Sequence, residues 1–176
     1  DIKKFSKFEK KIEYILVNDI HPDIEKITEE DNKDEVYRKS ILNAYKRENL
    51  QRNKIVEGIK DAKDDDWIII SDLDEIPNLN KIDFNNTQNK LVFFKQAMMY
   101  YKFNLKLENH IWVGSKACKM KNLISPQWIR NIKDRNYKWW RFDTLLSNMK
   151  YKNIKFVENG GWHFSYLKTS EGIEKK

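Results

Sequence analysis

The sequence predicts a mixed α/β fold with a central sheet flanked by helices. Two observations favour it: strand-like and helix-like segments alternate in the first half of the chain, and β-branched and aromatic residues crowd the second half. A third is size, since 176 residues with 40% hydrophobic content are enough to bury one core. Because there is no internal repeat and no Gly/Ser/Pro-rich linker, we predict a single domain over residues 1–176.

The first half of the chain predicts a strand, a helix and a second strand. Residues 12–17 (Ile-Glu-Tyr-Ile-Leu-Val) are strand-like, and the polar stretch 21–34, which contains a proline, predicts a loop. Residues 35–62 lack proline and place apolar residues three or four apart, which predicts a long helix. Residues 67–70 (Trp-Ile-Ile-Ile) are typical of a strand buried on both faces, and we expect this strand to lie parallel to the first.

The middle of the chain predicts an antiparallel strand pair and a short helix. Residues 91–107 and 111–120 are rich in β-branched and aromatic side chains and are separated by a polar turn. Cys118 falls in the second of these segments, where we expect it to be a core residue. Ser125-Pro126 supplies an N-cap and a proline at the first helical position, so a helix is predicted to begin there.

The last part of the chain predicts two short strands around the turn Asn159-Gly160-Gly161. These strands cover residues 154–157 and 161–166, and Thr169 is expected to cap a final helix. Ligand sites in α/β sheets lie beyond the carboxyl ends of the strands. Polar residues that directly follow a predicted strand are therefore the first candidates for a functional site.

Charge and composition exclude several classes of protein. Lys and Arg number 34 against 27 Asp and Glu, and the net charge of +7 reflects either solvated lysines or a surface that attracts phosphate-bearing ligands. No apolar run approaches the ~20 residues that cross a bilayer, and the first residues are not a signal peptide. We therefore expect no membrane span, and the single cysteine favours a reducing compartment. The single cysteine excludes an intrachain disulfide and a cysteine-rich zinc module.

An acidic turn follows the buried run, at residues 71–75 (Ser-Asp-Leu-Asp-Glu). Its three carboxylates repel one another and lose hydration beside a buried strand, so a positive group is expected to compensate them. Asp72 and Asp74 stand where the chain leaves the strand, and both can turn toward one hard cation such as Mg²⁺ or Mn²⁺. The alternative is an exposed acidic turn in which Asp72 caps backbone amides.

The predicted helix has a polar interruption in an apolar stripe. One helical face carries Leu42, Tyr45, Asn49, Arg52, Val56 and Ile59. Because a buried guanidinium requires an anion, Arg52 must have a partner. Glu48, one helical turn earlier, is the partner that the spacing predicts, and a bound diphosphate is the functional alternative.

A Gly-Gly-Trp-His motif lies within residues 159–166. In an extended strand, His163 and Ser165 share one face. The other face carries the aromatic residues of the motif and is predicted to be core: Trp162, Phe164 and Tyr166. His163 therefore offers its imidazole to whatever lies opposite, and the alternative is a core histidine hydrogen-bonded to backbone. The remaining histidines are expected at the surface: His21 and His110.

Residues 48–77 and 160–173, with the Asp-Leu-Asp-Glu-Ile-Pro turn and the Gly-Trp-His-Phe-Ser motif, resemble glycosyltransferase family 17, the family of the enzyme that adds bisecting GlcNAc. The resemblance begins at about Lys11 and is weak through 80–150. It implies a GT-A-like nucleotide-sugar fold with a mixed central sheet, whose first strand would precede residue 1. It also implies a metal-dependent transfer with inversion, Mn²⁺ or Mg²⁺ as cofactor, and a UDP-GlcNAc-like donor and a glycan acceptor as partners. Because the sequence shows no membrane anchor of the kind that the Golgi enzymes of this family have, we expect a cytoplasmic location in a bacterium or virus.

The resemblance further implies roles for individual residues. Asp72 and Asp74 would hold the metal on the donor diphosphate, and His163 would complete the metal or phosphate site. The donor contacts implied on this basis are Asn49, Arg52, Asn53, Asp72, Trp162 and Ser165.

The sequence offers three candidates for the general base that would deprotonate the acceptor hydroxyl: Glu75, Asp143 and Glu158. Asp143 is preferred because it follows Trp139-Trp140-Arg141-Phe142. These aromatic side chains can stack on a sugar and are expected to raise the pKa of the carboxyl.

Two other functions are compatible with the sequence. A basic nucleic-acid-binding protein or an Asp-x-Asp metal nuclease would use the positive charge together with Trp128, Trp139 and Trp140. A catalytically inactive, carbohydrate-binding relative of the glycosyltransferases is the third hypothesis. If the protein is a glycosyltransferase, nucleic acid is not an expected partner. Metal-dependent hydrolysis of a UDP-sugar would distinguish a glycosyltransferase from a nucleic-acid-binding protein or nuclease.

Overall fold

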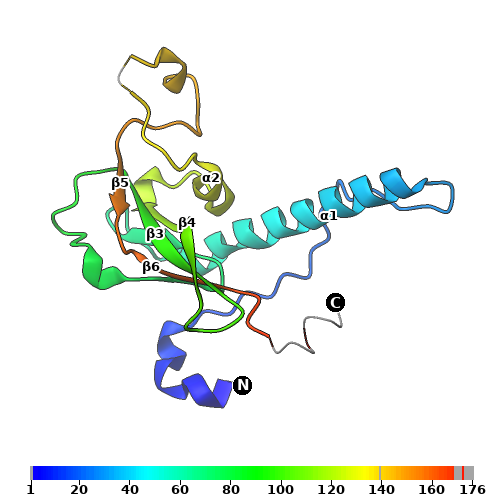
Figure 1. Ribbon diagram of the computed structural model, residues 1–176, viewed down its shortest axis with the longest axis horizontal. Coiled ribbons are helices and arrows are strands. Elements are labelled where there is room, and N and C mark those ends of the chain that lie inside the picture. Colours follow the sequence, from blue (N-terminus) through cyan, green and yellow to red (C-terminus); the bar gives the residue numbers. More distant parts are fainter. Residues whose placement is uncertain (1, 139, 169–171, 173–176) are drawn as a thin grey trace. The chain divides into compact units, whose positions relative to one another are not determined.

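The structure is a computed structural model that describes residues 2–138, 140–168 and 172 (Figure 1). Contacts divide the chain into two compact units: one holds the residues up to Ala62 with Ser125–Gln127, and the other holds Lys63–Ile124 with the residues from Trp128 onward. A division by contacts does not decide whether the two units unfold together, so the single domain over 1–176 stays a prediction. None of the helices in the described residues is long and apolar enough to cross a membrane.

The first unit is built around one long helix. It contains the 3-10 helix η1 (Ile2–Lys11), the α-helix α1 (Lys33–Asn53) and the 3-10 helix η2 (Lys54–Ile59). A reciprocal capping box starts α1: the side chain of Asn32 accepts from the Glu35 N–H (2.9 Å), and the Glu35 carboxylate accepts from the Asn32 N–H (3.0 Å). The helix predicted over 35–62 is therefore confirmed in place, with its last turns tightened to 3-10 geometry.

Two predictions for this unit are wrong. Residues 12–17 form no strand, because a strand needs a neighbour to satisfy its backbone and the described residues of this unit include no other strand. The stripe along α1 is not a buried face either, since Leu42, Tyr45 and Val56 are exposed. The buried residue of α1 is Asn43, whose side chain bonds both the N–H (2.9 Å) and the carbonyl (2.7 Å) of Glu25 in the preceding loop.

The second unit contains a strongly curled six-stranded mixed sheet. Its strands are β1 (Trp67–Ile70), β2 (Glu75–Pro77), β3 (Leu91–Tyr100), β4 (Lys106–Lys119), β5 (Ile154–Val157) and β6 (Gly161–Ser165). The strand order is β1-β4-β3-β6-β2, with β5 also paired to β3. Short helical segments connect the strands: η3 (Leu79–Lys81), η4 (Met120–Asn122), α2 (Pro126–Asn131) and η5 (Phe142–Thr144).

Most of the predicted elements of the second half are confirmed. The strand at Trp67–Ile70, the antiparallel β3–β4 pair, the helix that begins at Pro126, and β5 and β6 all lie where the sequence predicts them. The expected parallel partner of β1 is wrong, because β1 is an edge strand that pairs antiparallel with β4. β5 and β6 do not pair with each other; they run parallel to successive halves of β3. The helix expected after Thr169 lies outside the described residues.

The core of the second unit lies on both sides of β3. Phe93 and Phe94 are neighbours in this strand, point to opposite faces of the sheet and are both fully buried. One cluster of buried side chains consists of Val92, Phe94, Ala117 and Val157, with Trp67, Ile69, Ile82 and Phe84 packed against it. β3 is thus covered on both faces. The strands paired with it, β4, β5 and β6, are held in place by this core.

Cys118 is confirmed as a core residue, and its thiol is expected to be unreactive in the native protein. Burial raises the pKa of this thiol to about 12. At pH 8 its thiolate fraction should be lower than that of an unfolded cysteine by a factor of about 10³. Labelling with Ellman's reagent at pH 8, with and without denaturant, checks this: modification should follow unfolding, and immediate full labelling of the native protein would contradict the buried position.

Candidate active site

Pairing between β2 and β6 brings together the two motifs that the sequence singled out. In this antiparallel pair Glu75 lies opposite His163, and Ile76 lies opposite Trp162. The acidic turn therefore faces the Gly-Gly-Trp-His motif across a short ladder. The Asp74 carbonyl accepts a hydrogen bond from the Phe164 N–H (2.9 Å), which fixes the end of the turn against β6.

Asp74 and His163 form the closest pair among the predicted metal ligands. The Asp74 Oδ2 and His163 Nε2 atoms are 3.4 Å apart. His163 is buried and stacks on Trp112, with ring centroids 4.6 Å apart and an interplanar angle of 19°, whereas the Asp74 carboxylate is 49% exposed. The site therefore has a rigid imidazole on its inner side and a solvent-accessible carboxylate on its outer side.

Arg130 is the positive group that compensates the acidic turn. Its guanidinium bonds the Asp72 carboxylate (2.8 Å), both oxygens of Glu75 (2.8 and 3.0 Å) and the Gly114 carbonyl. The guanidinium side chain is only 11% exposed. The repulsion between Asp72 and Glu75 is thus relieved inside the chain, and Asp74 is the carboxylate of the turn that does not contact Arg130.

Glu75 is a buried structural carboxylate. Its side chain is fully inaccessible and accepts hydrogen bonds from Trp112 Nε1 (2.7 Å) and from the Asp72 N–H (3.0 Å), besides those of Arg130. Burial by itself would raise the pKa of Glu75, but the bonds from Arg130 and Trp112 outweigh it and leave the pKa below its ordinary value. A carboxylate held in this way is a poor proton acceptor, so the geometry favours a positioning role for Glu75 over the predicted role as general base.

A second polar chain extends the network into the sheet. Ser71 and Ser115 share a hydrogen bond between their hydroxyls (2.5 Å), and the fully buried Gln96 donates to Ser115 Oγ (3.1 Å). Each of these groups has its partner inside the protein, which is what burial of polar side chains requires. The acidic turn is consequently tied to β3 and β4 by side chains as well as by its flanking strands.

Sequence reasoning missed Arg130 and Trp112, which do most to shape this site. Arg130 lies in α2, and nothing in its local sequence indicates an acidic partner 55 residues away. For Trp112 a weak signal exists, because Trp112 and Gly114 share one face of a strand and the glycine leaves that face open. A side chain at Gly114 would place its Cβ 1.9 Å from Glu75 Oε1, so only glycine admits the buried carboxylate.

The residues present fit a divalent cation that is shared with a substrate. Among the described residues no three His, Cys, Asp or Glu side chains are grouped to hold a metal by themselves. Mg²⁺ and Mn²⁺ sites on nucleotides use only one or two protein ligands plus phosphate oxygens. Asp74 Oδ2 and His163 Nε2 have the spacing of neighbouring ligands, and Asp72, which Arg130 holds, lies in the same turn. The other ring nitrogen of this histidine, His163 Nδ1, is buried and has no hydrogen-bond partner among the described residues.

The other predicted donor contacts do not join this pair. Trp162 and His163 are neighbours in β6 and point to opposite faces. The prediction that the aromatic face is core is wrong for Trp162 (40% exposed) and Tyr166 (49%), whereas Phe164 is half-buried against Phe103. His163, on the other face, is 7% exposed. Ser165 pairs with Tyr100 at the far end of the strand.

The predicted donor contacts on α1 belong to the first unit. Arg52 bonds Glu48 (2.7 Å), as the spacing predicts, and also the Gln127 side chain (2.5 Å). Asn53 accepts from the Gln127 N–H (3.0 Å), and the buried Asn49 Oδ1 has no hydrogen-bond partner among the described residues. Within its unit Arg52 therefore has the carboxylate partner that a half-buried guanidinium needs.

The expected environment of Asp143 is wrong. Two bonds from Arg141 (2.8 Å each) and one from Lys150 (2.7 Å) hold its carboxylate. These cations lower the pKa of Asp143 well below its ordinary value, where the sequence predicted that aromatic neighbours would raise it. The Asp143 side chain is 39% exposed, and Trp139, one of the aromatic residues expected beside it, lies outside the described residues. A strongly acidic carboxylate is a weak general base.

Comparison with known proteins adds no further guide to this site. The sequence matches no family model and no curated protein, and the structure matches no solved structure.

Proposed function

We propose that this protein is a metal-dependent glycosyltransferase that moves a hexose, GlcNAc or a related sugar, from a nucleotide diphosphate donor to a glycan hydroxyl. The observation that supports it best is the 3.4 Å contact between Asp74 and His163, which joins the acidic turn to the Gly-Gly-Trp-His motif. These are the two segments on which the resemblance to glycosyltransferase family 17 rests. Their meeting at the end of β2 is what a shared donor site requires.

The chain's own residues would divide the work of holding the donor. Asp74 and His163, with Asp72, would hold Mn²⁺ or Mg²⁺, and such an ion neutralises charge on the diphosphate leaving group. Arg130 fixes Asp72 and removes the repulsion of Glu75, so the turn keeps one orientation without a ligand. Trp112 holds the imidazole plane of His163 by stacking, which restricts the direction in which Nε2 points. The site is thereby preorganised for an anionic donor.

Asp74→Asn tests this proposal. The substitution removes the accessible carboxylate, so Mn²⁺-dependent affinity for UDP should fall by at least about tenfold. Asp74 is half-exposed and outside the Arg130 network, so the free energy of unfolding should change by no more than about 0.5 kcal/mol. Isothermal titration of UDP with and without Mn²⁺, and urea unfolding of the same sample, give both values.

Asp65→Asn is the matched control, because Asp65 is also an exposed aspartate and forms ion pairs with Lys119 and Lys121, away from the candidate site. It should bind UDP like the parent protein. Undiminished Mn²⁺-dependent binding by the Asp74 variant would contradict the metal site. Mn²⁺-dependent cleavage of single-stranded DNA by the parent, lost in the same variant, would instead favour the nuclease hypothesis.

A further inference from the structure

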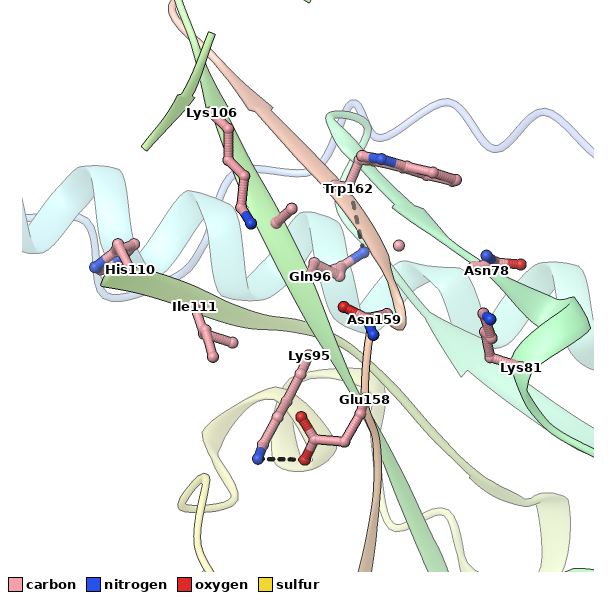
Figure 2. Close-up of a pocket in the computed structure, with 12 residues that line it drawn as sticks. Asn78, Lys81, Lys95, Gln96, Lys106, His110, Ile111, Glu158, Asn159 and Trp162 are labelled. Carbon is pink, nitrogen blue, oxygen red and sulfur yellow. Dashed lines mark hydrogen bonds and ion pairs between the residues drawn. The ribbon is translucent and has the colours of Figure 1, made fainter. Parts of the chain in front are cut away.

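A cavity lined largely by polar side chains lies beside β6 (Figure 2). Its lining includes Trp162 and not the next residue, His163, whose side chain lies on the other face of the strand. Its volume is about 340 Å³, in the lower part of the range for sites that hold small molecules. Side chains from four separate segments form its wall: Asn78, Lys81, Gln96, Lys106, Asn159 and Trp162. Figure 2 shows Lys106 on one side, Asn78 and Lys81 on the other, and Gln96 and Asn159 between them.

Backbone hydrogen bonds fix the floor of this cavity. Gly160 donates its N–H to the Lys95 carbonyl (2.7 Å), and its own carbonyl accepts from the Asn78 N–H (2.8 Å). The next residue, Gly161, has a φ of +130° and lies against the backbone of Ile76, where no side chain fits. The turn that presents Asn159 and Trp162 is therefore rigid before any ligand arrives.

The wall of the cavity carries excess positive charge. Lys95 is neutralised by Glu158, with 2.6 Å between Nζ and Oε1. For Lys81 and Lys106, by contrast, the described part of the chain places no carboxylate within ion-pair distance. Three lysines and one glutamate leave a charge of 3 − 1 = +2 on the wall. Such a cavity favours an anionic ligand.

Amide and indole groups in the same wall indicate which kind of molecule carries the negative charge of the ligand. The Gln96 amide is fully buried and donates to Ser115 and to the Trp162 carbonyl (3.1 and 3.4 Å), so it supports the wall from inside and is not itself a ligand contact. Asn78 and Asn159 add amides that can both donate to and accept from hydroxyl groups. The half-exposed indole of Trp162 gives a flat apolar surface at the rim. Hydroxyl-binding amides beside one aromatic plane are suited to a sugar ring.

We propose that this cavity binds an anionic sugar, a pyranose that carries a phosphate or a carboxylate. Lys81 and Lys106 bind the anionic group, and Trp162 contacts the ring. A nucleic-acid strand is the less favoured occupant, because strand binding uses a groove with successive aromatic platforms and this cavity is small and has one. The proposal goes beyond the glycosyltransferase proposal, since it needs neither the metal nor Asp74.

Isothermal titration in EDTA tests the proposal, because the chelator removes any contribution from a metal-dependent donor site. The probes are glucose 6-phosphate, glucuronate, glucose and inorganic phosphate. At least one of the two anionic sugars should bind tighter than both glucose and inorganic phosphate by about tenfold or more, and which of them does so identifies the charged group. No binding of either anionic sugar, or equally tight binding of inorganic phosphate, would overturn the proposal.

Substitutions locate the site. Lys81→Gln and Lys106→Gln should each weaken binding of the anionic sugar by about tenfold, and Trp162→Ala should reduce it to the affinity of the free anion. Lys121→Gln is the matched control, because it removes the same charge from an exposed lysine that pairs with Asp65 outside the cavity. If the control weakens binding as much as the cavity variants, the effect is net charge and the site is wrong. Thermal unfolding confirms that each variant is folded.

Discussion

Replacing Arg130 by methionine is expected to lower the free energy of unfolding by about 3–5 kcal/mol. The guanidinium bonds Asp72, Glu75 and Gly114 at once, and Glu75 is completely buried. Methionine matches the aliphatic part of the arginine side chain but has no donor, so among the described residues it leaves the buried Glu75 carboxylate with Trp112 and one backbone N–H as hydrogen-bond donors. Urea unfolding monitored by circular dichroism measures the loss.

A double variant separates the buried charge from the lost packing. Glu75→Gln removes the charge and keeps an acceptor for the Trp112 N–H, so adding it to Arg130→Met should restore a large part of the stability. Arg141→Met is the control for loss of an exposed ion pair, since Arg141 and Asp143 are 50% and 39% exposed, and it should cost no more than about 1 kcal/mol. Equal losses for the two arginine variants would contradict the view that Arg130 compensates the acidic turn.

Arg130→Lys separates charge from geometry. Lysine keeps a cation near Glu75 but cannot bond two carboxylates and a carbonyl through one planar fork. The free energy of unfolding of Arg130→Lys should therefore be intermediate between the values of the parent protein and of Arg130→Met. If Arg130 also positions Asp72 for a metal, the affinity of Mn²⁺ and UDP should fall with it. The same residue then links the stability of the turn to its proposed function.

Local sequence patterns predicted the strands of the second unit because these strands are short, apolar and bounded by turn residues. The run Trp67–Ile70, the β3–β4 pair and the two strands around Asn159–Gly161 all have such boundaries. These local sequence patterns do not indicate which strands pair with each other. β1 pairs with β4 rather than with residues 12–17, and β3 is long enough, at 10 residues, for β5 and β6 to pair with its successive halves.

The candidate site was only partly predictable for the same reason. Asp74 and His163 could be predicted as site residues because each follows a feature that is visible in the local sequence. Asp74 follows an all-apolar strand, and His163 follows a double glycine. The expected positive partner of the acidic turn was correct in kind, but Arg130 is brought to it by the packing of α2. In β6 Trp162 is exposed and His163 is buried against Trp112, because a two-residue period does not tell which of the two faces of a strand is buried.

Gly161 is where one substitution should disturb both proposed sites. Its φ of +130° belongs to a region that side chains rarely adopt, which costs about 1–3 kcal/mol for a residue with a Cβ. A Cβ would also lie 2.1 Å from the Ile76 carbonyl oxygen and 2.9 Å from Pro77 Cα, and both of these are backbone atoms of the paired strand β2. To relieve this clash the β2–β6 ladder has to separate.

Gly161→Ala is accordingly expected to lower the free energy of unfolding by at least about 3 kcal/mol, by strain and by clash together. Because the ladder joins Glu75 to His163, the folded fraction should also lose Mn²⁺-dependent UDP binding. Gly58→Ala is the control: Gly58 lies in η2, and the nearest atom to its added Cβ is the flexible end of Ile15, at 3.0 Å. It should change stability by less than about 1 kcal/mol. Urea unfolding of both variants decides the matter, and a Gly161 variant as stable as the control would mean that β2 and β6 are not paired in this register.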